Sequence, residues 1–119
     1  NMIILNDSYN SNVLGFKNAI DVLLLYENDK YLITPGIVET KNDEINEEIA
    51  YYLLDKNINV ILINNKSSVV YEKIFKNNSK HDYLVCKSFK EAYKYVLNEA
   101  KNKEICVLIE NDLTDDFFL

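Results

Sequence analysis

The chain has 119 residues, of which 27% are charged and 48% are hydrophobic, and its formal net charge at pH 7 is -6. This length and composition are those of one globular domain with a substantial core. The acidic balance argues against a nucleic-acid partner, which would need a basic face, and no apolar segment is long enough to suggest a membrane span.

Apolar runs that alternate with helical patterns predict an α/β fold. We expect short, apolar, buried strands at Met2–Leu5, Tyr31–Thr34, Val60–Ile63, Tyr83–Val85 and Ile105–Ile109. Helices are expected at about Val13–Tyr26, Asp43–Lys56 and Ser67–Asn77, and from a capping box that begins at Ser88. The alternation implies right-handed crossovers and a Rossmann-like three-layer sandwich, in which helices cover both faces of a mostly parallel sheet of five or six strands.

The polar segment Asn6–Asn12 joins the first expected strand to the first expected helix. Open α/β sheets bind ligands just beyond the carboxyl ends of their strands, so a carboxylate and amides here could bind ribose hydroxyls or polar substrate groups. The same residues would also suit an ordinary loop in which Ser11 or Asn12 caps the helix. On residue chemistry alone, the cap is the better interpretation.

The sequence Asp7-Ser8-Tyr9-Asn10-Ser11-Asn12 resembles the segment that opens the C-terminal domain of the Mur ligases. These ATP-dependent enzymes build the peptide of bacterial cell-wall precursors. The resemblance implies that Asp7, Tyr9 and Asn10 bind the nucleotide, with Asp7 on the ATP ribose across an interdomain cleft. It also implies that Asn10 and Asn12 lie near the incoming amine substrate. Val13 replaces the usual proline, which affects the start of the helix more than the chemistry.

A second segment, Thr34–Glu39, follows the second expected strand. It is similar to the corresponding segment of the Mur ligases that add D-alanyl-D-alanine, and Glu39 matches the family glutamate. This resemblance implies that Glu39 positions the substrate loop, although Thr40 and Lys41 depart from the family pattern. The alternative is a Pro-Gly turn with Glu39 as a first-turn acid of the next helix. If the first two strands are neighbours, both polar segments lie side by side.

The segment Glu110–Asp115 is similar to the ending of many of these relatives, and the alternative is a solvated acidic tail. His81 has no second histidine or nearby cysteine, so we expect an exposed loop residue and no metal site. The two cysteines, Cys86 and Cys106, lie in apolar runs and are expected to be buried thiols.

The chain has two glycines, Gly15 and Gly36, and no Gly-x-x-x-x-Gly-Lys phosphate-binding loop. In Mur ligases that loop belongs to a central domain, and an N-terminal domain holds the UDP-sugar. Residues 1–119 are therefore expected to be the C-terminal domain of a longer cytoplasmic enzyme. That enzyme would use ATP and Mg²⁺, a UDP-MurNAc-peptide and an amino acid or dipeptide. The domain alone would be inactive, with no catalytic residue and no bound cofactor, and it would orient the amine substrate and help to close the cleft.

The best alternative is a receiver or flavodoxin-like binding module. A receiver needs an acidic pair after its first strand, which Asn6 and Asp7 half fit. It also needs an aspartate after the third strand and a lysine after the fifth, where this chain has Asn64 and Glu110. A domain used only for protein contacts is a third possibility.

Overall fold

The computed structural model describes residues 2–8, 12–38 and 40–110. Within these ranges five strands alternate with four helices, which confirms every element expected from the sequence. They are β1 (Met2–Asp7), α1 (Val13–Leu23), β2 (Asp29–Thr34), α2 (Glu44–Leu53), β3 (Asn59–Ile63), α3 (Ser68–Asn77), β4 (Tyr83–Cys86), α4 (Phe89–Glu99) and β5 (Ile105–Glu110).

The described strands form one sheet in the order β1-β5-β2-β3-β4, and each neighbouring pair is parallel. The last strand, β5, lies between the first two, since Ile105 is in register with both Met2 and Asp29. The first two strands are therefore not neighbours. As a result, the segments that follow β1 and β2 are separated by the end of β5.

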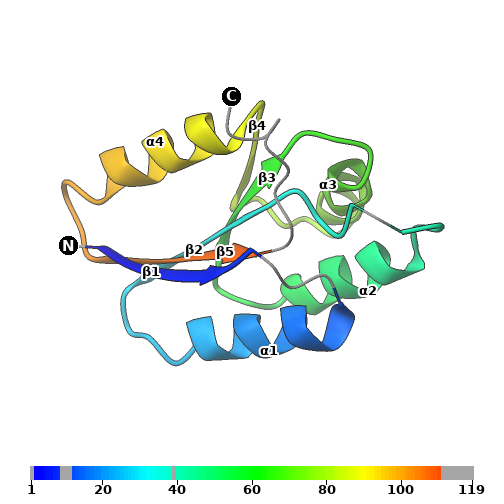
Figure 1. Ribbon diagram of the computed structural model, residues 1–119, viewed down its shortest axis with the longest axis horizontal. Helices are drawn as coiled ribbons and strands as arrows, with labels where there is room; N and C mark the ends of the chain where they lie inside the picture. The colour runs from blue at the N-terminus through cyan, green and yellow to red at the C-terminus, as the bar shows by residue number, and fades with distance from the viewer. Residues whose placement is uncertain (1, 9–11, 39, 111–119) are drawn as a thin grey trace.

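The helices cover both faces of the sheet unequally, as Figure 1 shows. The chain crosses the sheet in one direction from β1 to β4, and then returns to β5. Right-handed crossovers consequently place α1, α2 and α3 on one face and α4 on the other. The first face buries side chains from those three helices, among them Phe16, Leu53 and Phe75, while the second buries Ala92 and Val96 of α4. These are the layers of the expected three-layer sandwich.

The strands differ in burial according to their place in the sheet. All six residues of the central strand β5 are buried. In the edge strand β1, by contrast, Ile3 is 39% exposed and Ile4 is 44% exposed. Leu84 and Val85 of the other edge strand, β4, are also exposed. The expectation that every strand is buried on both faces was wrong for these two, because an apolar run carries no sign of whether a neighbour pairs on each side.

Helix ends also differ from expectation by a few residues. α1 ends at Leu23 rather than Tyr26, since the amide of Tyr26 donates to the carbonyl of Leu23 in a tighter turn. α2 ends at Leu53 rather than Lys56 for the same reason. The expected start of α4 is confirmed: Ser88 Oγ accepts the amide of Glu91 at 3.1 Å.

The two cysteines are buried and free, as predicted. Burial raises the pKa of the Cys86 thiol to about 11, and it also raises the pKa of Cys106. Both side chains are therefore neutral at physiological pH and pack as small apolar groups. Among the described helices, none is both long and apolar enough to cross a membrane.

Candidate functional site

The carboxyl ends of three adjacent strands bring together the segments that the sequence singled out. β1 ends at Asp7 and β5 at Glu110, and these two residues are in register. On the other side of β5, Ile109 is in register with Ile33, so Thr34 at the end of β2 follows at the same edge. Since all three strands are parallel, segments that are distant in sequence meet at one edge of the sheet. This edge is where open α/β sheets bind ligands.

A groove of about 530 Å³ runs beside β1 and leads to Asp7. Residues Ile4–Asp7 form one wall and α1 forms the other, where Gly15, which has no side chain, and the small residue Ala19 line the groove. Its lining combines apolar side chains, such as Ile4 and Val22, with the polar side chains of Asn6, Asp7 and Asn18. Asp7 is half-buried there, at the last position of β1. This mixed lining suits a ligand that carries both apolar groups and hydroxyl or amine donors.

Asn12 caps α1: its Oδ1 accepts the amide of Gly15 at 2.7 Å. The structure thus confirms the capping interpretation for this residue. The expected contact of Asn12 with the amine substrate stays a prediction. Asn6 makes a similar local bond, with its Oδ1 accepting the amide of Ser8 at 3.1 Å. Three other expected site residues, Tyr9, Asn10 and Glu39, lie outside the described residues.

The turn after β2 is held by its own residues and by a side chain from α2. Thr34 Oγ1 accepts the amide of Gly36 at 3.0 Å. Asn46 bonds both backbone groups of Ile37: its Oδ1 accepts the amide at 2.8 Å, and its Nδ2 donates to the carbonyl at 3.0 Å. Ile37 is consequently fixed at both polar backbone atoms by one carboxamide.

Three residues from α3 and the loop before it make further hydrogen bonds to the turn and to Asn46. Ser67 Oγ donates to the carbonyl of Ile37 at 3.0 Å, and Asn65 Nδ2 donates to the carbonyl of Pro35 at 2.7 Å. The hydroxyl of Tyr71 donates to Asn46 Oδ1 at 2.7 Å. We call Asn46, Asn65, Ser67 and Tyr71 the turn clamp. It joins α2 and α3 to the turn at the carboxyl edge.

Sequence reasoning missed the turn clamp, although one signal was present. Asn46 is 1% exposed, and it lies at helical spacing from the buried residues Ile49, Ala50 and Leu53. An asparagine on the buried stripe of a helix is unusual, since a buried amide must find hydrogen-bond partners. The helix was instead interpreted only through its apolar positions.

Gly36 is required at the centre of this turn for two reasons. Its φ is +82°, in the region that other residues rarely adopt. A Cβ at this position would also lie 2.8 Å from Tyr71 Cε1 and 3.1 Å from Asn46 Oδ1. The clamp therefore packs directly against the backbone of Gly36.

Glu110 is fully buried, so the alternative interpretation, a solvated acidic tail, does not hold for this residue. Burial first, and then the negative charge of Glu110, raise the pKa of the Tyr71 hydroxyl. Tyr71 is therefore protonated at neutral pH and available to donate to Asn46. Residues 111–115 of this segment lie outside the described residues.

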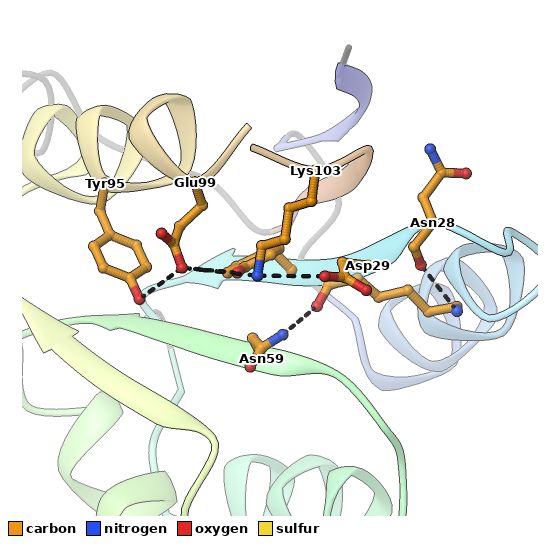
Figure 2. A network of polar contacts seen from close by, with 8 residues as sticks. Asn28, Asp29, Asn59, Tyr95, Glu99 and Lys103 are labelled. Atoms are coloured by element: carbon orange, nitrogen blue, oxygen red, sulfur yellow. Dashed lines mark hydrogen bonds and ion pairs between the residues drawn. The ribbon is translucent and has the colours of Figure 1, made fainter. Parts of the chain in front are cut away.

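A separate polar network lies at the opposite, amino end of the sheet (Figure 2). Lys103 Nζ is 3.3 Å from Asp29 Oδ2 and 3.7 Å from Glu99 Oε1. The hydroxyls of Tyr31 and Tyr95 both donate to the same Glu99 oxygen at 3.4 Å. These contacts tie the end of α4 to the start of β2, which gives the network a structural role in holding α4 on its face.

His81 is exposed at a smaller cavity of about 200 Å³ beside this network, which confirms its expected place in a loop. Across residues 2–8, 12–38 and 40–110, no three His, Cys, Asp or Glu side chains gather closely enough to hold a metal ion.

No family model matches the chain, and no curated protein does either. Among solved structures, the fold is similar to that of MurF from Acinetobacter baumannii, with a TM-score of 0.72 and 14% sequence identity. The match covers 88% of this chain and 24% of that one, so the chain spans about a quarter of the length of the matched protein. At this level of identity the likeness establishes the three-layer α/β fold.

Proposed function

We propose that residues 1–119 are the C-terminal, substrate-orienting domain of an ATP-dependent amide ligase of the Mur ligase family. The observation that carries this proposal is the meeting of three segments at one edge of the sheet. The adjacent strands β1, β2 and β5 end at Asp7, Thr34 and Glu110. Each of these residues begins or lies within a segment that resembles the family. The structural likeness to MurF over 88% of the chain supports the same conclusion.

The geometry around Asp7 fits one part of ATP, the ribose. Asp7 supplies a half-buried carboxylate to the lining of the groove, and a carboxylate can accept hydrogen bonds from two neighbouring hydroxyls. Asp7, with Tyr9 and Asn10, would hold the nucleotide from this side. Bound ATP and Mg²⁺ would supply the activation of the carboxylate substrate. The phosphates and the metal are assigned to a central domain, since this sequence has no phosphate-binding loop.

The contribution of this chain would be orientation of the amine substrate. We assign Asn10, Asn12 and Glu39 to that substrate, for which the family resemblance favours D-alanyl-D-alanine. The carboxylate substrate would be a UDP-MurNAc-tripeptide held mainly by the N-terminal domain. Holding the amine against the activated carboxyl group and excluding water would accelerate amide formation without a catalytic side chain from this domain. The proposed enzyme works in the cytoplasm, with no nucleic-acid or membrane partner.

The strand order argues against the receiver or flavodoxin-like alternative. In those folds the order is 2-1-3-4-5, so that β1 pairs with both β2 and β3. Here β5 separates β1 from β2. In addition, the position after β3 that would carry the phosphorylated aspartate is held by Asn64.

The test is phosphate release by the purified full-length protein that contains this chain, assayed with Mg·ATP. Release should require both a UDP-MurNAc-tripeptide and D-alanyl-D-alanine, and mass spectrometry should find the amide product. The 119-residue chain alone should release none. A full-length protein that forms no amide with any amino acid or dipeptide would contradict the proposal.

A further inference from the structure

We propose that Asn46 is a positioning residue of this site, which fixes the turn after β2 at Ile37, two residues before Glu39 in the sequence. The inference rests on the proposed function and extends it to a residue of α2 with no resemblance behind it. Asn46 lies nine residues after Ile37, and it bonds the amide and the carbonyl of Ile37. One side chain of α2 thus holds the turn after β2 at both polar backbone atoms of Ile37.

The three hydrogen bonds of Asn46 define which side chain this position needs. Its Oδ1 accepts from Ile37 and from Tyr71, and its Nδ2 donates to Ile37. An aspartate could accept two bonds but would have no donor for the carbonyl of Ile37, and its charge would be buried. Asparagine supplies both functions at this size, so the position is specific in chemistry as well as in shape.

Burial limits the movement of the turn clamp. Asn46 is 1% exposed and Tyr71 is fully buried, so water cannot replace a lost bond at low cost. Gly36 packs against both side chains, which leaves the turn little room to move. The start of the loop is therefore preformed before any substrate binds, and the ordering cost that a free loop would add to substrate binding is removed in advance.

The closing experiment uses two variants of the clamp and one control. Asn46→Asp removes the donor to Ile37 at nearly constant volume, and Tyr71→Phe removes one bond to Asn46 and leaves the other two. Val96→Ala is the control, because Val96 lies on α4 and is buried against the opposite face of the sheet. Its substitution should destabilise the fold without touching the clamp. Amide hydrogen exchange at Ile37 is measured in the 119-residue chain. The KM values for ATP and for D-alanyl-D-alanine are measured in the full-length protein.

In Asn46→Asp we expect exchange at Ile37 to become about tenfold faster, from the lost bonding at a buried site. The KM for the dipeptide should rise by roughly tenfold, with the KM for ATP unchanged. Tyr71→Phe should give smaller changes in the same direction. Val96→Ala should lower thermal stability without a selective change in the dipeptide KM.

Each outcome bears on the inference separately from the proposed function. An active Asn46→Asp enzyme with faster exchange at Ile37 and an unchanged dipeptide KM would overturn the positioning role and leave the ligase assignment standing. Unchanged exchange at Ile37 would overturn the clamp itself. A wild-type full-length protein without amide-ligase activity would overturn the proposed function, and the positioning role with it.

Discussion

Replacing Gly36 by alanine should destabilise the fold by an amount that the turn geometry sets. The backbone at φ +82° costs a non-glycine residue about 1 to 2 kcal/mol. The new Cβ would lie 2.8 Å from Tyr71 Cε1, and a contact this close forces a shift that costs about 1 to 3 kcal/mol in a packed region. The expected loss is therefore about 2 to 5 kcal/mol, from the sum of these two costs. Urea unfolding followed by far-UV circular dichroism measures it, a suitable probe because the chain has no tryptophan.

The chain offers a control with the same chemical change and the opposite expected sign. Gly15 lies inside α1, where alanine is the better helix former by about 1 kcal/mol, so Gly15→Ala should leave stability unchanged or raise it. If Gly36→Ala were as stable as the wild type, the turn would not be packed as described, and the argument for the turn clamp would fail.

Three further outcomes are expected. In the full-length protein, Asp7→Ala should lower kcat/KM for ATP by about one to two decades, because a charge-assisted hydrogen bond is lost. The circular dichroism spectrum should be unchanged. Unaltered nucleotide kinetics would mean that this loop has a structural role alone. Lys80→Met should lower the free energy of unfolding by about 1 to 3 kcal/mol, because the buried ammonium bonds the carbonyl of Ile58 at 3.2 Å, and a variant of wild-type stability in urea would contradict this. The free energy of unfolding should also fall as the pH rises from 9 to 11, because the Cys86 pKa is raised from 9.0 to about 11 in the folded chain and the unfolded thiol ionises first. A Cys86→Ala variant should lose less of its free energy of unfolding over that range. An equal loss in the variant would refute the assignment to Cys86.

The elements of the fold were predictable because each carries a local pattern. The apolar face of α1 with Phe16, Ile20 and Leu23 follows helical spacing, and Ser88 marks the start of α4 by its capping chemistry. The order of the strands was not predictable in this way. Pairing of β5 with both β1 and β2 depends on contacts between the two ends of the chain, which no local pattern records. The exposure of the two edge strands follows from that order and was missed with it.

The candidate site was predictable only in its location. Polar segments after apolar runs indicated the carboxyl edge, since strand ends carry both turn residues and ligand residues. The chemistry that holds the edge together comes from elsewhere, namely from Asn46 on α2 and Tyr71 on α3. Glu110 could be interpreted as the first residue of an acidic tail, because nothing in the residues that follow it shows that its side chain is buried at the end of β5.

The central place of β5 also determines the order in which this domain can assemble as it is synthesised. Among the described strands, β1 pairs with β5 alone, yet β1 leaves the ribosome first and β5 last. A nascent chain that stops before Ile105 can pair β2, β3 and β4, but among the described strands it has none to pair with β1 and so leaves the first core, which includes Phe16, incomplete. Because contacts between residues distant in sequence form slowly, insertion of the last strand is expected to limit the rate of folding. Until that insertion Ile3 and Ile4 stay on an unpaired strand, which is when the chain is most open to chaperones and to aggregation.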